Sequence, residues 1–164
     1  MIALKHILVA TDFSEPSAAA LEYGRHFARA FGATLHVLHI AENVIARFGA
    51  EAYPMILPDL QRDVEEAAEK RLAATIDDDD RRTLTVVPVV RTSAVPAAAI
   101  VEYAAQARVD LIIMGTHGRG AVAHLFVGSV AERVVRAAPC PVLTVHHPER
   151  EFIAPDALVA VARQ

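Results

Sequence analysis

The sequence predicts an α/β, Rossmann-like fold: an open parallel sheet of five strands, in the order 3-2-1-4-5, with helices on both faces. Three observations predict it. Five short runs rich in valine, isoleucine and leucine recur along the 164 residues, the segments between them have helical spacing, and two prolines mark edge strands. Near-continuous apolar strands that alternate with amphipathic helices are typical of a parallel sheet buried on both sides.

The apolar runs are the expected strands, and they cover residues 5–10, 34–40, 84–90, 109–115 and 141–146. Pro88 lies inside the third run, and proline within a sheet is confined essentially to edge strands. Pro141 opens the fifth run, which is weaker evidence because a strand anywhere in a sheet can begin with proline. With runs three and five at the edges, runs one and four flank the point where the strand order reverses, and ligands bind there in open α/β sheets.

The helices are expected between the strands, where apolar residues recur at intervals of three and four. Ser14 precedes Glu15 and Pro16, which suits an N-cap followed by proline in the first turn. The acidic run 77–80, before two arginines, is expected to form a solvated turn. Apolar faces comprise Leu21, Gly24, Ala28 and Phe31; Leu60, Val64, Ala68 and Leu72; Ile100, Val101 and Ala104; and Val130, Val134 and Ala137.

Composition limits the class of protein. The net charge of −4 and the lack of a basic stripe argue against nucleic acid as a partner. One cysteine allows no internal disulfide, no apolar run reaches the roughly 20 residues of a membrane span, and the start lacks signal-peptide anatomy. We therefore expect a cytoplasmic protein without a membrane partner.

We expect one domain over residues 1–147 and a tail, 148–164, with a possible short helix. Residues 41–58 are expected to form either a lid over the ligand or a passive insertion.

Glycines cluster directly after the fourth apolar run. Gly115 and Gly118 are followed, after nine intervening residues, by Gly128 and Ser129. Glycine lets the backbone approach a ligand closely, and a turn that opens a helix offers free N–H groups and a positive helix end to phosphate. These features predict a nucleotide phosphate site. Simple turn or capping roles remain the alternative for each of these residues, and Ser129 can cap its helix and contact phosphate at once.

A second polar cluster, residues 11–14, follows the first run and so meets the same crevice. Asp12 there is a candidate ligand contact, or a residue that orders the turn. This turn contains no Gly-x-Gly-x-x-Gly, which disfavours a dinucleotide enzyme, and the chain contains no Gly-x4-Gly-Lys-Ser/Thr. His117 is more readily a packing residue than a general base. His36 and His39 are three apart on an expected strand and point to opposite faces, which disfavours a metal site.

With these residues in view, residues 4–147 resemble the nucleotide-binding branch of the universal stress protein family. That branch is marked by Gly-x2-Gly-x9-Gly-Ser/Thr, and the pattern is complete here in Gly115, Gly118, Gly128 and Ser129. Residues 7–14 resemble the family's first strand and its aspartate, residues 35–40 its second strand, and residues 138–145 its last strand. The full spacing between a strand and a helix, together with the aspartate, is what makes the resemblance specific.

The resemblance implies a set of binding residues and a cofactor. The cofactor would be ATP, or AMP or ADP, with Mg²⁺ held by the phosphates rather than by a protein cage. Arg119 is either a phosphate clamp or an ordinary exposed arginine. The implied contacts are Ala10, Thr11 and Asp12 with the adenosine half, Ile40 with adenine, Met114 and Gly115 beneath the ribose and phosphates, and Gly118, Arg119, Gly128, Ser129 and Val130 around the phosphates.

The function expected from these features is that of an ATP-binding regulatory module of the stress response, whose nucleotide modulates dimer or partner surfaces. One alternative is a slow Mg-dependent ATP phosphohydrolase or phosphotransferase that uses Asp12, although no catalytic set is evident. Another is a nucleotide-free interaction scaffold. The resemblance implies a homodimer, and the apolar edge 142–145 supports it because pairing with a second copy would remove an exposed strand edge.

Overall fold

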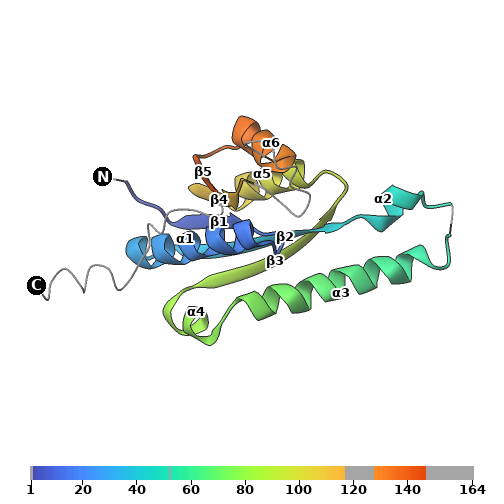
Figure 1. Ribbon diagram of the computed structural model, residues 1–164, viewed down its shortest axis with the longest axis horizontal. Coiled ribbons are helices and arrows are strands. Elements are labelled where there is room, and N and C mark those ends of the chain that lie inside the picture. The colour runs from blue at the N-terminus through green and yellow to red at the C-terminus, as the bar shows by residue number, and fades with distance from the viewer. Residues whose placement is uncertain (1, 52, 117–127, 147–164) are drawn as a thin grey trace, which may run out of the picture.

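Five parallel strands form the centre of the protein in the order β3-β2-β1-β4-β5, as the sequence predicts (Figure 1). The structure is a computed structural model that describes residues 2–51, 53–116 and 128–146. β2 runs two residues further than expected, and β3 begins two residues later. The strands are β1 (His6–Ala10), β2 (Thr34–Glu42), β3 (Val86–Ser93), β4 (Leu111–Gly115) and β5 (Val142–Val145).

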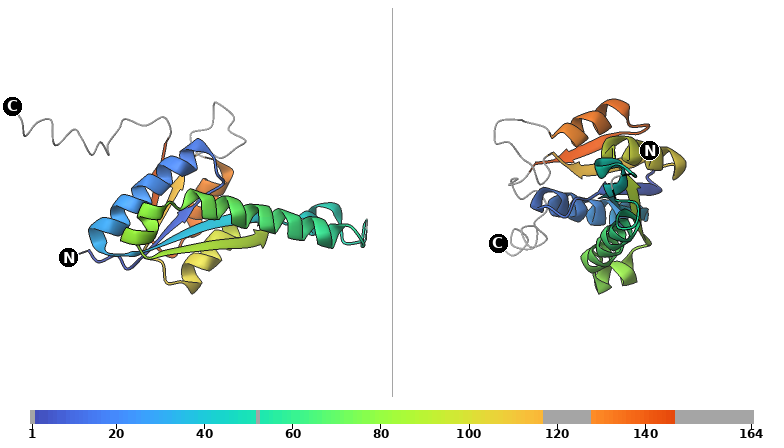
Figure 2. Two further views of the ribbon diagram at one scale, coloured as in Figure 1. Left: turned by 90° about the horizontal axis from the view of Figure 1, so that it is seen from below. Right: turned by 90° about the vertical axis from the view of Figure 1, so that its right-hand side faces the viewer.

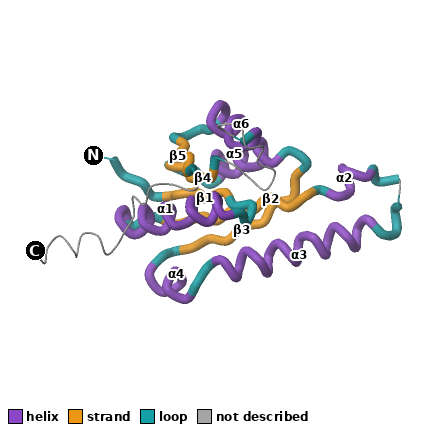
Figure 3. The backbone as a smooth tube through the Cα atoms, in the orientation of Figure 1, coloured by secondary structure: helices purple, strands orange, loops and turns teal. Residues whose placement is uncertain are grey.

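Helices cover both faces of the sheet (Figure 2). One face packs against α1 and α3, and the other packs against α5 and α6. Figure 3 shows α2 and the first turns of α3 projecting past the end of the sheet. The helices are α1 (Glu15–Phe31), α2 (Val44–Phe48), α3 (Leu57–Thr75), α4 (Asp78–Thr83), α5 (Pro96–Gln106) and α6 (Ser129–Ala137). No helix in these described ranges is both long and apolar enough to cross a membrane.

The two layers of core follow from the alternation of side chains along each strand. In β1, Ile7 and Val9 pack toward α1, whereas Leu8 packs toward α5 and α6, and all three are fully buried. A strand buried on both sides has no polar face, which is why the strand sequences read as continuous apolar runs. Pro88 lies on β3, which pairs with β2 alone, so its missing N–H leaves the sheet intact.

The start of α1 is as predicted in position but differs in its hydrogen bonds. Ser14 is the N-cap, with extended backbone angles, and Pro16 lies in the first turn. The Ser14 hydroxyl, however, donates to Asp12 Oδ1 and does not cap the helix N–H groups. The helix ends at Gly32, whose φ of 63° lets its N–H bond to the Ala28 carbonyl.

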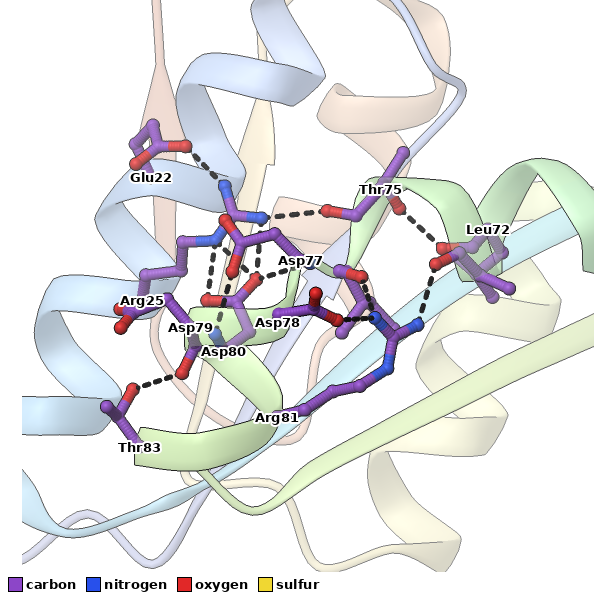
Figure 4. Close-up of polar contacts among 12 residues, drawn as sticks. Glu22, Arg25, Leu72, Thr75, Asp77, Asp78, Asp79, Asp80, Arg81 and Thr83 are labelled. Atoms are coloured by element: carbon purple, nitrogen blue, oxygen red, sulfur yellow. Dashed lines mark hydrogen bonds and ion pairs between the residues drawn. The ribbon is translucent and has the colours of Figure 1, made fainter.

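The expectation of a solvated turn at residues 77–80 was wrong. These residues begin α4, with Asp77 as N-cap in a reciprocal capping box with Asp80 (Figure 4). The Asp80 side chain is only 2% exposed and pairs with Arg25 of α1. Asp80 therefore takes part in the capping box of α4 and also joins α4 to α1. The local sequence gives no sign of this ion pair because Arg25 lies 55 residues away.

Residues 41–58 contain regular structure. β2 occupies the first two of them, and α2 follows, with Asn43 as N-cap accepting from the Ala46 N–H at 2.8 Å. Gln61 ties this segment to α3, because its side chain accepts from Val44 N and donates to the Glu42 carbonyl. Whether the segment moves as a lid stays a prediction, and the tail 148–164 lies outside the described residues.

Candidate functional site

The carboxyl ends of β1 and β4 lie side by side, at the point where the strand order reverses. Ala10 is in register with Met114, so Thr11 and Asp12 leave the sheet next to Gly115. Ala10 is also in register with Leu38 of β2, which puts Ile40 at the same edge. The structure thus brings together six of the predicted contact residues. Gly118 and Arg119 lie outside the described residues.

The turn from β1 into α1 is held by a chain of hydroxyl groups. Thr11 N donates to the Leu38 carbonyl at 2.9 Å. Ser17 Oγ donates to the Ser14 carbonyl at 2.9 Å and lies 3.1 Å from Thr11 Oγ1. Because a hydroxyl has one proton, Thr11 must donate to Ser17, and it accepts from Phe13 N at 3.0 Å. Thr11 and Ser17 are buried, so this network fixes the turn from beneath.

Asp12 both orders the turn and faces a cleft. Its Oδ1 accepts from Ser14 N at 3.0 Å as well as from the Ser14 hydroxyl. The carboxylate therefore lies before the first turn of α1, where the helix dipole favours negative charge. The next residue, Phe13, has a φ of 64°, a left-handed conformation that a residue with a Cβ adopts at a cost of about 1–2 kcal/mol. Both sequence interpretations of Asp12 are thus compatible with its geometry.

The cleft has a volume of about 380 Å³ and lies between the β1–α1 turn, the end of β2 and the middle of α3. Two predicted contact residues, Asp12 and Ile40, line it. The contribution of α3 was not predicted: its apolar face was recognised, but nothing in the spacing indicated which neighbour that face would meet. The full lining is Asp12, Phe13, His39, Ile40, Ala41, Glu42, Val64, Ala67, Ala68 and Arg71.

Three rings or planar groups form one wall of this cleft. The Arg71 guanidinium carbon lies 4.5 Å from the centroid of the Phe13 ring, which in turn lies 4.3 Å from the centroid of the His39 ring. His39 Nδ1 is 2.8 Å from the Thr11 carbonyl, so this nitrogen carries the proton and donates. The wall therefore joins α3, the β1–α1 turn and β2 through contacts between neighbouring planar groups.

The start of α6 reaches β4 directly. Gly128 N donates to the Thr116 carbonyl at 2.5 Å, and Gly128 is the N-cap with extended backbone. Ser129 is the first helical residue and is exposed, so it is not the capping residue that the sequence allowed it to be. The N–H groups of a first turn point out along the helix axis and favour an anion, which is the chemistry predicted for Ser129 and Val130.

Gly115 is a glycine for a reason of packing. A Cβ built there would lie 2.9 Å from Pro16 Cβ and 3.0 Å from the Pro16 carbonyl carbon. Any larger residue would therefore push the first turn of α1 away from the end of β4. The end of β4 and the first turn of α1 are thus in direct contact.

The histidines of β2 point to opposite faces, as predicted. His36 Nδ1 is 2.8 Å from the Tyr103 hydroxyl on the α5 side, and its Nε2 is 3.2 Å from His6 Nδ1. Burial, together with the neighbouring His6, lowers the pKa of His36. His39 faces the cleft instead. Within the described ranges, no three histidine, cysteine or acidic side chains gather in a way that could hold a metal ion.

Comparison with known proteins identifies the family and agrees with the fold. The family model described as the universal stress protein family matches residues 3–146. A universal stress protein of Thermus aquaticus is 40% identical over 146 residues, which cover 86% of this chain and 98% of that protein. The solved structure of hypothetical protein MJ0577, from Methanocaldococcus jannaschii, superposes with a TM-score of 0.80 at 26% identity, covering 91% of this chain and all of the other. A universal stress protein solved in complex with cAMP superposes with a TM-score of 0.57 at 25% identity, covering 88% and 98% of the two chains.

Proposed function

This chain belongs to the universal stress protein family, and we propose that it is an ATP-binding regulatory module of the stress response. In this proposal the bound nucleotide changes the surface offered to a second copy or to another partner. One observation carries it: Asp12 and Ile40 line a cleft between the β1–α1 turn, the end of β2 and α3. The end of β4 and the start of α6 lie next to the β1–α1 turn, at the same carboxyl end of the sheet. The solved complex of a family member with cAMP supports an adenine nucleotide as the ligand.

In the proposed binding mode, the adenosine and the phosphates of the nucleotide occupy two chemically different regions. Adenosine occupies the cleft, where Ile40 and Ala41 offer apolar surface and Asp12 offers a carboxylate acceptor. The ribose and phosphates run past Met114 and Gly115 toward the start of α6. There the first-turn N–H groups and the Ser129 hydroxyl would donate hydrogen bonds to the phosphates. Gly118 and Arg119 would complete this cradle, and the phosphates would themselves hold Mg²⁺.

Asp12 has a positioning role in this proposal rather than a catalytic one. Its Oδ1 accepts two hydrogen bonds from Ser14, which hold the carboxylate in the turn. A base that activates water must be able to accept a proton from that water in the reacting geometry. A carboxylate engaged with the backbone and hydroxyl of its own turn is better suited to orienting the ligand.

We also propose a homodimer that forms through β5. This strand pairs with β4 on one side, and among the described residues nothing pairs with its other side. A second copy pairing there would satisfy the exposed backbone groups. Light scattering at micromolar concentration is expected to give the mass of two chains, and the mass of one chain would contradict the dimer.

Ligand-induced stabilisation tests the nucleotide proposal. ATP with Mg²⁺ at one hundred times its dissociation constant should stabilise the fold by about 2.7 kcal/mol. For a chain of this size, that raises the melting temperature by roughly 5–11 °C. Gly118→Val and Ser129→Ala should reduce the shift, whereas Asp78→Asn, on exposed α4, should leave it unchanged. A folded wild-type protein that no adenine nucleotide stabilises would refute the proposal.

A further inference from the structure

Among the arginines that the structure describes, Arg71 is the one that lines the cleft. It extends from α3 to the cleft, where its guanidinium lies over the Phe13 ring. Its polar contact with the β1–α1 turn is a long hydrogen bond, which Nη2 donates to the Phe13 carbonyl at 3.4 Å. An aromatic face rather than a carboxylate therefore holds the guanidinium at the cleft.

Most arginines in the described ranges are engaged differently. Arg62 on the same helix pairs with Asp59 at 2.7 Å, and Arg25 and Arg29 pair with Asp80. Among the described residues, no carboxylate lies within ion-pair distance of Arg71, although Asp12 and Glu42 line the same cleft. Its charge is thus available to a ligand.

The Phe13 ring beneath Arg71 is itself held by neighbours. It contacts both the Arg71 guanidinium and the His39 ring, and the Phe13 backbone has a φ of 64°. His39 is itself fixed by the Thr11 carbonyl at 2.8 Å. Non-glycine residues in this conformation persist only where their surroundings hold them, and they gather at ligand sites. The stack is a preformed wall rather than a chance contact.

We propose that Arg71 is a specificity-determining residue of the cleft and stacks its guanidinium on the heteroaromatic base of the bound nucleotide. This inference rests on the proposed function. A guanidinium is planar, permanently charged and weakly hydrated, so it stacks well on an electron-rich ring. Phe13 holds the guanidinium at the cleft, where a bound base would stack on it.

The base, rather than the phosphates, is the group within reach of Arg71. α3 packs against β2 and β3, whereas the phosphates are expected at the start of α6, beyond β1 and β4. The lining around Arg71 is small and apolar: Val64, Ala67 and Ala68 come from the same helix. Such a surface suits a planar ring, and the neighbouring carboxylates Asp12 and Glu42 in the lining disfavour a phosphate there.

The test compares ligands with and without phosphates. Dissociation constants of adenosine and of ATP with Mg²⁺ are measured by calorimetry for the wild type, Arg71→Ala, Arg71→Lys and the control Arg62→Ala. Arg71→Ala should weaken both ligands by the same factor, about five- to thirty-fold. Arg71→Lys keeps the charge but loses the planar stack, so its loss should be intermediate. Arg62→Ala should bind as the wild type does.

A second measurement examines base selectivity. If Arg71 stacks on the base, its removal should narrow the preference for ATP over CTP, because a purine offers the larger ring to the guanidinium. A loss confined to ATP would reveal a phosphate contact and overturn the inference, as would unchanged affinities in a folded Arg71→Ala protein. A wild type that binds neither adenosine nor ATP would overturn the proposed function, and this inference with it.

Discussion

Replacing Asp80 by asparagine should destabilise the fold more than any other single loss of charge in α4. Asp80 is 2% exposed, and its two oxygens accept from Arg25 Nε at 2.9 and 2.8 Å. Arg25 Nη2 also donates to the Thr75 carbonyl at 2.8 Å, which ties α1 to the end of α3 (Figure 4). The asparagine variant keeps the shape of the side chain but leaves the buried guanidinium without this charged partner.

The magnitude follows from the burial of the pair. Removing one partner of a buried ion pair costs about 3–5 kcal/mol, because the remaining charge stays desolvated. Two features lower the estimate: Arg25 retains an ion pair with Glu22, and the amide oxygen of asparagine still accepts one hydrogen bond. We therefore expect a loss of about 3 kcal/mol in the free energy of unfolding, or roughly 6–12 °C in melting temperature.

Urea unfolding followed by far-UV circular dichroism at pH 7 measures this loss directly. The matched control is Asp78→Asn in the same helix, since Asp78 is 99% exposed and its partner Arg81 lies 3.6 Å away. An exposed pair of this kind contributes about 0–1 kcal/mol. If the two substitutions lowered the free energy of unfolding equally, this prediction would be wrong, because burial of the Asp80–Arg25 pair would then add nothing to stability.

Three further predictions concern the core, the crevice and pH. Gly24→Ala should destabilise by about 1–3 kcal/mol in urea, although alanine favours helix, because its Cβ would overlap the stiff Val9 side chain. Gly115→Ala should cost a similar amount even in nucleotide-free protein, since its clash is with Pro16; a normal stability would mean that the glycine serves only the ligand. His36 has a lowered pKa in the folded state, so unfolding takes up a proton and stability should fall as pH drops through about 6.5. His36→Gln should show a shallower loss between pH 7.5 and 5.5, and an unchanged slope would contradict this.

The fold could be predicted because its signals are local and repeat along the chain. Each buried strand is a continuous apolar run, and Pro88 alone is enough to favour an edge position for β3. Ser14 and Pro16 predicted the start of α1 to the residue. What failed was Asp80, whose sequence neighbours are acidic and exposed and whose buried partner Arg25 belongs to a helix far earlier in the chain.

The candidate site could be predicted in part for the same reason. Asp12 follows β1, and Met114 and Gly115 end β4, so the strand order alone brings them together. Arg71 and His39 were not predicted as site residues. Their positions depend on how α3 lies across β2 and on the left-handed turn at Phe13, and neither leaves a pattern in the spacing of residues.

The dissociation constant of ATP tests most directly whether this protein is a nucleotide-binding module. Purified protein is stripped of nucleotide, its fold is verified by circular dichroism, and it is titrated with ATP and Mg²⁺ in a calorimeter. We expect a micromolar or tighter dissociation constant for the wild type and no measurable binding by Gly118→Val. A folded wild-type protein that releases no heat with ATP, ADP or AMP at several temperatures would contradict it, and the interaction-scaffold alternative would then take its place.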